Sequence, residues 1–511
     1  MRQVTVDTTL WMKNVVFALF LLAVAVIPRL IVLLTAETRT DADESIVGLM
    51  AIHIARGEGV PIFFYGQHYG GGHVIEALIA ALLFRLFGVS SLIVQAIPAV
   101  FAAGVILVVF FSLRRCAGGG IAFLAALILA FSTPFLKSSL KADGYIETIF
   151  LGLLALHLLQ HLVLTNEQGT KTNLILYATG FLLGLAWWSY DFGLVYLAAV
   201  SLVLLVHKKL TVSRAVVFGV FFLVGATPLI YDNLTSDFAN LKHLLYGRTT
   251  AEPLAAHFFR SAIRFLQYDF AASLTRDCIH NFPPSIPTAA LIYALIAGGG
   301  FVVSLLGRKN LNLPAALYIT PLIFVFLYFL SPFSGASPRY LLPLEPFISI
   351  HIAAAVFILM RSRHCIAHMV SVCVFFLMIS VLSFGFSSII SDKSIVEGNV
   401  KTDPKSVTEI IEFLNSENIT CVHTTYFIKW RIIFESREKI AAIDMLASRK
   451  PDSYMRYESR GCPPGAPVAI VLHKRSPYFL SNLNRLDSDF NIHYTTDHVI
   501  IYKKAVDSRN R

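Results

Sequence analysis

Residues 15–34 read VVFALFLLAVAVIPRLIVLL, and residues 35–50, TAETRTDADESIVGLM, follow them directly. A helix needs about 20 apolar residues to cross about 30 Å of hydrocarbon, because its backbone N–H and C=O groups must bond to one another there. The first stretch has that length, and the second sets Asp41, Asp43 and Glu44 close to where the chain leaves the bilayer. The junction therefore predicts a membrane anchor with an acidic loop beside it.

The chain divides into a membrane-like part and a water-soluble part. Of its 511 residues, 56% are hydrophobic and only 14% are charged, whereas soluble domains carry about 25% charged residues. Residues 1–390 hold 24 Lys/Arg and 17 Asp/Glu, while the much shorter stretch 391–511 holds 18 and 15. We therefore expect an all-α polytopic membrane domain over residues 1–390 and a small soluble α/β domain over residues 391–511, which excludes an ordinary soluble enzyme.

Eleven apolar segments qualify as candidate spanning helices. They lie near residues 15–34, 92–113, 121–137, 145–163, 174–190, 192–206, 213–231, 287–306, 314–331, 340–360 and 366–390. Residues 74–88 contain Glu76 and Arg85 and would extend only about 22 Å as a helix. We expect that segment, and an amphipathic helix after the acids at residues 46–54, to lie along the membrane interface.

The basic residues of the membrane part predict its orientation. Alternate loops collect 12 Lys/Arg against two acids, Asp7 and Glu167, and the positive-inside rule makes that side cytoplasmic. An odd number of spans then places the tail on the outer side, which in a bacterium is the periplasm. We expect a multi-pass protein of the bacterial inner membrane whose net charge of +10 reports orientation and indicates no nucleic-acid partner.

The first outer loop carries the densest group of acids, Asp41, Asp43 and Glu44. Such acids can simply cap a helix, with Ser45 or Asp43 as the capping residue. They can also act as a general base for an acceptor hydroxyl, or bind a divalent cation through their oxygens. Desolvation and mutual repulsion would raise the pKa of at least one of them.

Further polar candidates lie in the same loop and in the next two outer loops. In the first loop they are His68, Tyr69 and His73; in the second, residues 138–148, SSLKADGYIET, they are Lys141, Asp143 and Glu147; in the third they are Arg339 and Glu345. Charged side chains at helix ends often have no role beyond extending into water. An ion pair between Arg339 and Glu345 would be a structural explanation of both residues.

Several familiar motifs are missing. There is no H-E-x-x-H string and no paired-cysteine spacing, which makes a zinc site improbable, and there is no phosphate-binding G-x-x-x-x-G-K-[ST] string. Of the six cysteines, only Cys421 and Cys462 share the tail, so one disulfide is an open alternative there. The tail itself reads as helix-like at residues 404–417 and strand-like at 419–424, 439–443, 468–473 and 499–503.

The order of these features resembles the bacterial membrane glycosyltransferases of the C-type superfold, relatives of protein O-mannosyltransferases and lipid A aminoarabinose transferases. The resemblance rests on the opening span, DADE at residues 41–44, and ARGEGVPIFFYGQHYGGGHVIEALIAALLFRLFGVS at residues 55–90. In the tail, TYFIKWRIIFESREKIAA at residues 425–442 resembles the outer domain of uncharacterised bacterial members. The chain departs from the mannosyltransferase pattern because it lacks the H-P-P-x-x-K stretch.

The resemblance implies an inverting transferase that takes a sugar from a polyprenyl-phosphate donor to a glycan, lipid or protein acceptor at the outer face. It implies Asp43 as the general base, Glu44 as its acidic neighbour and Asp143 as an acid of the second loop. Lys141 and Arg339 are the candidates for holding the donor phosphate. A divalent cation is an alternative for that charge, and Asp43, Glu44 and Asp143 would be its ligands.

Other classes of function stay open on the sequence. A transporter or lipid flippase would move its substrate without a covalent product, and a polysaccharide polymerase or ligase would move a chain of sugars. No inverted repeat or pair of corresponding broken helices of the kind that transporters show is visible. A non-enzymatic scaffold is a further alternative.

Overall fold

The computed structural model describes residues 8–502, apart from 36–39, 66, 166–169, 209–210, 247–252, 271–285, 312, 332–333, 335–336, 392–394, 398–399, 404, 446–461, 463–466 and 476–489. The chain forms two compact units. The first comprises Met1–Val32, Pro98–Leu140 and Gly144–Ile389. The second comprises Leu33–Ile97, Lys141–Asp143 and Ile390–Arg511, so that parts of the first two outer loops belong with the tail.

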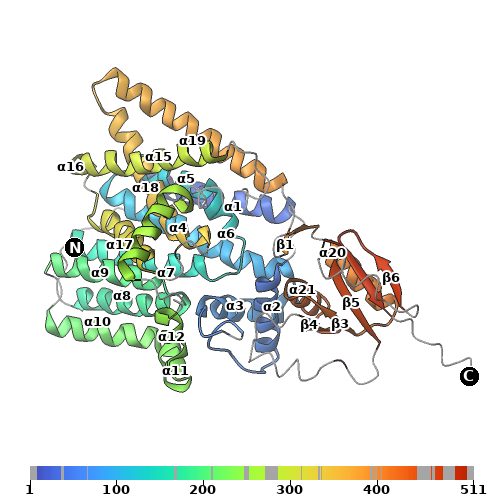
Figure 1. Ribbon diagram of the computed structural model, residues 1–511. Helices are drawn as coiled ribbons and strands as arrows, with labels where there is room; N and C mark the ends of the chain where they lie inside the picture. The colour runs from blue at the N-terminus through green and yellow to red at the C-terminus, as the bar shows by residue number, and fades with distance from the viewer. Residues whose placement is uncertain are drawn as a thin grey trace, which may run out of the picture. The chain divides into compact units, whose positions relative to one another are not determined.

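The first unit is helical. Its helices are α1 (Thr8–Thr35, which ends in the second unit), α4 (Ser91–Cys116, which begins there), α5 (Gly119–Phe131), α6 (Thr133–Ser138), α7 (Tyr145–Thr165), α8 (Thr170–Ser189), α9 (Gly193–Val206), α10 (Val212–Gly225), α11 (Thr227–Thr235), α12 (Ala239–Tyr246), α13 (Leu254–Arg264), the π-helical η1 (Phe265–Asp269), α15 (Ile286–Leu306), α16 (Arg308–Leu311), α17 (Ala316–Leu330), the 3₁₀ helix η3 (Pro338–Leu344), α18 (Glu345–Met360) and α19 (Cys365–Ser391). Figure 1 labels most of these helices and colours the chain from blue at the N-terminus to red at the C-terminus.

Each of the eleven predicted segments falls on a helix or on two consecutive helices of this set. Within the described residues, four helices are long and apolar enough to cross a membrane, and a bent pair makes a fifth. The four are Ser91–Cys116, Tyr145–Val163, Arg339–Met360 and Cys365–Ser391. The helical membrane class is thus confirmed, while the number of eleven spans stays a prediction.

Two of the predicted spans are broken. Residues 121–137 divide at Ser132, whose backbone leaves the helical region at φ −55° and ψ 122°, and Pro134 starts the next helix. Residues 213–231 divide between α10 and α11, which meet at 68° just before Pro228. Proline has no N–H for the preceding turn, so an apolar run that contains a proline does not guarantee a straight helix.

Close backbone approach holds α8 against α10. A Cβ on Gly184 would lie 2.1 Å from the carbonyl oxygen of Phe222, and one on Gly225 would lie 2.2 Å from that of Phe181. Only glycine leaves room for such contacts. Small residues at helix crossings are typical of membrane bundles, because lipid is as apolar as the helix surface and the helices associate through close packing.

The second unit combines two helices of the first outer loop with the tail. The loop forms α2 (Ala42–Ala55) and α3 (Gly71–Phe87). The tail has a hairpin of β1 (Ile395–Glu397) and β2 (Val400–Thr402), the helices α20 (Ser406–Ser416) and α21 (Tyr426–Glu435), and a five-stranded sheet of β3 (Cys421–Thr424), β4 (Ala441–Asp444), β5 (Val468–His473), β6 (Asn491–Tyr494) and β7 (His498–Tyr502).

The sheet has the order β4-β3-β5-β7-β6. Strand β3 pairs in parallel with β4 and β5, while β7 pairs antiparallel with β5 and β6. The predicted α/β character of the tail is therefore confirmed, and its four expected strands are β3, β4, β5 and β7. Sequence reasoning missed β1, β2, β6 and α21, since the three strands have only three or four residues each and the charged residues of α21 do not gather on one face.

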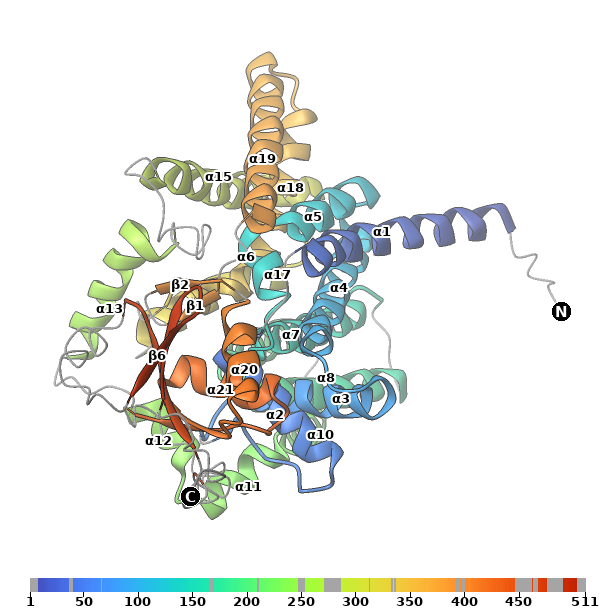
Figure 2. The ribbon, with the colours of Figure 1, turned by 90° about the vertical axis from the view of Figure 1, so that its right-hand side faces the viewer.

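Helix α21 lies between the sheet and α2, as Figures 1 and 2 both show. Eight of its ten residues are buried, including Trp430 and Phe434, because β3 and β4 cover one side and α2 another. For the same reason α2 is buried along almost its whole length. A helix does form over residues 46–54, as expected. The expectation that it lies along the membrane interface is wrong, because α3 and α21 cover it.

Candidate functional site

The first turn of α2 is built as a capping box. The Glu44 amide donates to Asp41 Oδ1 at 3.0 Å, and the Asp41 amide donates to Glu44 Oε2 at 2.9 Å. The two carboxylates thus satisfy amides that a helix N-terminus leaves without partners. Asp41 is therefore the capping residue, which corrects the expectation of Ser45 or Asp43. Ser45 instead lies 2.8 Å from the Thr40 hydroxyl.

The second outer loop meets this turn. Lys141 Nζ lies 3.4 Å from Asp41 Oδ2, and the backbone N–H of Ala142 donates to Glu44. The Asp143 amide donates to the carbonyl of Lys141 at 2.9 Å, so Asp143 stands in the same tight turn. Two segments about 100 residues apart in sequence thus bring a cation beside Asp41, and its charge also acts on Glu44.

Glu44 is the carboxyl of this group whose proton affinity changes most clearly. It is only 3% exposed, and burial, followed by the negative charge of Asp41, raises its pKa to about 8. Lys141 and the N–H groups of Asp41 and Ala142 act in the opposite direction. Glu44 Oε1 has no hydrogen-bond partner among the described residues. At neutral pH Glu44 is mostly a neutral acid.

Asp43 lies in the same turn but in a different environment. It is partly exposed, and its Oδ1 accepts a hydrogen bond of 2.9 Å from the hydroxyl of Tyr426 on α21. The first turn of a helix also favours negative charge, because its free N–H groups form the positive end of the helix dipole. The two adjacent carboxyl groups of α2 therefore have different environments. Glu44 is buried, whereas Asp43 is partly exposed and accepts a hydrogen bond.

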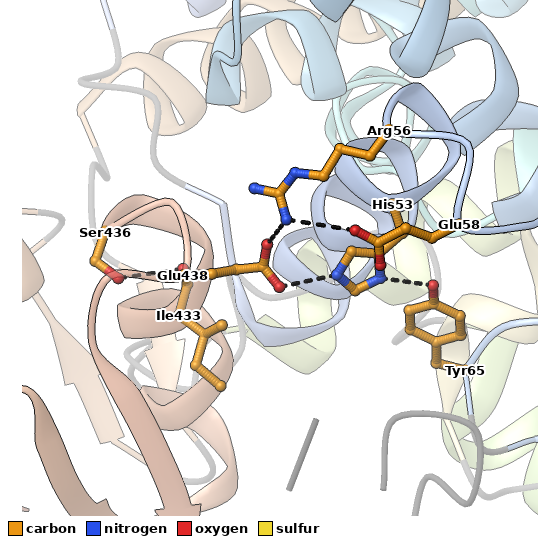
Figure 3. A network of polar contacts seen from close by, with 7 residues as sticks. All are labelled: His53, Arg56, Glu58, Tyr65, Ile433, Ser436 and Glu438. Carbon is orange, nitrogen blue, oxygen red and sulfur yellow. Dashed lines mark hydrogen bonds and ion pairs between the residues drawn. The ribbon is translucent and has the colours of Figure 1, made fainter. Parts of the chain in front are cut away.

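The other end of α2 carries a second polar network, shown in Figure 3. His53 is 2% exposed; its Nε2 lies 2.8 Å from Glu438 Oε1 and its Nδ1 lies 2.8 Å from the Tyr65 hydroxyl. An ionised carboxylate only accepts, so Nε2 carries the proton in the first of these bonds. Arg56 forms an ion pair with the other oxygen of Glu438 and lies 3.7 Å from Glu58.

The charges of this network agree with its geometry. Burial tends to raise the pKa of Glu438, but the hydrogen bond from His53 and the charges of His53 and Arg56 outweigh it, so that the pKa is lowered. Burial raises the pKa of Tyr65, with Glu58 and Glu438 adding to the effect. Glu438 therefore stays ionised and Tyr65 stays protonated near neutral pH.

Of the predicted first-loop residues, His73 has a structural position. Its Nδ1 lies 3.1 Å from the carbonyl oxygen of Gly70, and its ring packs 4.4 Å from that of Phe64. Gly70 has φ +78°, and a Cβ there would lie 2.8 Å from His73 Nδ1, so the turn requires glycine. His68 is exposed and Tyr69 partly exposed on the preceding loop.

The remaining predicted residues belong to the first unit. The Arg339 guanidinium lies 5.8 Å from the ring centre of Tyr145 and 5.4 Å from that of Tyr340, and its Nε has no hydrogen-bond partner among the described residues. Glu345 accepts a hydrogen bond of 2.5 Å from Ser132. The described contacts thus hold Arg339 and Glu345 in separate places and contain no ion pair between them. Glu147 is fully buried at the start of α7.

Sequence reasoning missed Tyr426, His53 and Glu438, because nothing in their local sequence shows that α21 meets α2. It also passed over Arg29, which is 1% exposed in α1 and whose Nη1 lies 2.8 Å from the Ala25 carbonyl oxygen. A charge inside a span is a functional candidate by default, so Arg29 could have been found.

The predicted divalent-cation ligands can be compared with the side chains that the structure describes. Across the part of the chain that the structure describes, no three His, Cys, Asp or Glu side chains gather in a way that could hold a metal ion. Asp43, Glu44 and Asp143 are all described, and Glu44 is engaged in the capping box. These residues do not fit the divalent-cation alternative as they stand.

The chain shares its overall fold with solved glycosyltransferases of the C-type superfold, which confirms the predicted resemblance at the level of fold. The chain is similar to ArnT from Cupriavidus metallidurans bound to undecaprenyl phosphate, with 13% identity, a TM-score of 0.63 and coverage of 96% of this chain and 98% of that one. The apo form of the Archaeoglobus fulgidus oligosaccharyltransferase follows with 13% identity, a TM-score of 0.53 and coverage of 89% and 69%. No protein-family model and no curated protein matches the sequence.

Proposed function

We propose that the chain is an inverting glycosyltransferase that moves a sugar from a polyprenyl-phosphate-linked donor to an acceptor hydroxyl on the outer face of the membrane. The acceptor oxygen attacks the anomeric carbon while the bond from that carbon to the phosphate oxygen breaks. Asp43 accepts the hydroxyl proton, and the polyprenyl phosphate leaves with the bonding electrons. The acceptor is a glycan, a lipid or a protein.

The observation that carries this proposal is the first turn of α2. It offers one partly exposed carboxylate, Asp43, beside a buried neutral acid, Glu44, and a cation, Lys141, which lies 3.4 Å from Asp41. A base for the acceptor and a positive charge for the leaving phosphate are the two groups that this reaction needs from a protein. Neighbouring carboxyls that lie in different environments are typical of sites for acid–base chemistry.

Negative charge builds up on the phosphate as the sugar leaves. Lys141 is 38% exposed, so its ammonium group can leave Asp41 and bind a phosphate oxygen instead. Arg339 of the first unit stays a separate predicted phosphate-binding residue, and its Nε has no hydrogen-bond partner among the described residues. The fold shared with ArnT, solved bound to undecaprenyl phosphate, supports a lipid phosphate as the leaving group.

The tail supports an outer location for the reaction. Cys421 and Cys462 form a disulfide with a Cα–Cα distance of 5.4 Å. Disulfides persist in oxidising compartments such as the periplasm. Because the tail and the acidic turn belong to one unit, we place both on the periplasmic side of the bacterial inner membrane, with the N-terminus in the cytoplasm.

The test is sugar transfer by the full-length protein in lipid vesicles, supplied with polyprenyl-phosphate-linked hexoses and pentoses and an envelope lipid and glycan extract. We expect a covalent product from the wild type and a loss of about 100-fold or more in Asp43→Asn, the usual contribution of a general base. The matched control is Asp237→Asn, because Asp237 is 87% exposed and has φ +55°, a conformation that Asn tolerates.

The other outcomes decide between the rival functions. Uptake of the lipid-linked sugar without a covalent product would assign a transporter or flippase. A product whose mass grows by many sugar units would assign a polymerase or ligase. Asp43→Asn at wild-type activity would remove Asp43 from the role of base.

A further inference from the structure

Helix α21 and the residues just after it contact α2 along its length. At the N-terminal end of α2, the Tyr426 hydroxyl donates to Asp43 Oδ1 at 2.9 Å. In the middle of α2, Phe434 packs so closely on Gly48 that a Cβ there would lie 2.3 Å from Phe434 Cε2. At the C-terminal end of α2, Glu438, three residues beyond α21, binds both His53 and Arg56 (Figure 3).

We propose that Tyr426 is a positioning residue for the carboxylate of Asp43, so that the α/β tail forms part of the reaction machinery. This inference rests on the proposed function. The Tyr426 hydroxyl holds one carboxylate oxygen and thereby fixes the rotation of the carboxylate about its Cβ–Cγ bond. A hydrogen bond to an ionised carboxylate is stronger than one between neutral groups, and it favours the charged form that a general base needs.

The position of Tyr426 is rigid enough for this role. The residue is 9% exposed, and its ring packs 5.5 Å from that of Phe427 and 6.3 Å from that of Trp430. A tyrosine at the start of a helix can reach one residue of a neighbour reproducibly only when the helix cannot slide. The Phe434 contact and the Glu438 ion pairs fix the register of α21 on α2.

The experiment compares wild type, Tyr426→Phe and Tyr494→Phe in the vesicle assay, with kcat, KM and the pH profile of kcat measured for each. Phenylalanine keeps the ring and removes only the hydroxyl. We expect Tyr426→Phe to lower kcat roughly tenfold, the value of one hydrogen bond to a charged group, with little change in KM for the donor. Tyr494, which is 57% exposed on β6, is the matched control and should change neither.

The pH profile separates positioning from a structural role. Without the hydroxyl, the Asp43 carboxylate is easier to protonate, so the acid limb of the profile should move to higher pH. The titratable groups described above at this turn are Asp41, Glu44, Lys141 and Asp143, together with Tyr426 itself, and only Tyr426 changes in the variant. A simple loss of folded protein lowers kcat without moving the limb.

Three results would overturn the inference. One is Tyr426→Phe with wild-type kcat and acid limb, which leaves the proposed function standing. Another is a lower kcat that follows a loss of folded protein in thermal unfolding, with an unmoved acid limb. The last is a wild type without transfer, which overturns the proposed function and this inference with it.

Discussion

Asp43 and Glu44 are adjacent in sequence, yet their side chains have opposite environments. The first turn of α2 directs Glu44 into the interior beside Asp41, and directs Asp43 toward the Tyr426 hydroxyl. Burial then raises the pKa of Glu44 to about 8. The sequence predicts that one of these carboxyls has a raised pKa, but which one depends on the helix turn and on what covers it.

Glu44→Gln tests the buried acid. A carboxyl whose folded pKa is near 8 and whose unfolded pKa is near 4.5 binds its proton more tightly in the folded state. Stability is therefore lost as pH rises from about 4.5 to about 8. Glutamine keeps the capping bond and carries no charge, so the variant should have a flatter Tm between pH 5 and 8 and a Tm a few degrees above wild type at pH 8.

Thermal unfolding in detergent across pH 5–9 measures this difference. The control is Glu412→Gln, because Glu412 is exposed on α20 and should leave the pH dependence unchanged. Equal pH dependence in Glu44→Gln and wild type would show that Glu44 does not titrate in this range.

At the scale of elements, the contact between α2 and α21 joins a loop near the start of the chain to the tail. Helix α2 is mostly apolar, and the charged residues of α21, namely Lys429, Arg431 and Glu435, do not gather on one face. Each helix is buried partly because the other covers it. A helix without a polar face cannot be told from a buried strand or a spanning segment by its pattern alone. That ambiguity is why α21 escapes prediction, while the strand at residues 468–473 is predicted with its observed ends.

Gly48→Ala tests this contact. The added Cβ would lie 2.3 Å from Phe434 Cε2, and Phe434 is 2% exposed, so it has little room to move. We expect a loss of about 1–3 kcal/mol in the free energy of unfolding, as is usual for overpacking. The matched control is Gly219→Ala in α10, where a Cβ would meet nothing within 4 Å; there alanine should be neutral or stabilise by up to about 1 kcal/mol. Equal effects in the two variants would contradict a tight helix contact.

For the whole molecule, the arrangement of loops in the membrane decides which face holds the reaction. The basic loops predict a cytoplasmic side that includes Arg361 and Arg363, just before Cys365. On this prediction the tail, with Cys462, is periplasmic. We then expect the exposed Cys365 and the disulfide-bonded Cys462 to lie on opposite sides of the membrane.

Labelling with a membrane-impermeant maleimide tests this orientation. In a Cys421→Ser variant with the other cysteines except Cys462 replaced by serine, we expect intact spheroplasts to react with the reagent. A variant that retains only Cys365 should react only after permeabilisation. The opposite pattern would invert the orientation and place the acidic turn in the cytoplasm.

The sequence by itself determines the membrane class, the helical segments, the α/β tail and the acidic turn at residues 41–44. These follow from local properties, namely apolar length, charge density and short-range spacing, and the C-type glycosyltransferase fold agrees with them. Only the tertiary structure decides that Asp41 is the cap, that Lys141 meets it and that Tyr426 and Glu438 hold the two ends of α2. Contacts between residues up to about 385 positions apart depend on how whole elements pack, and no local pattern in one chain records that packing.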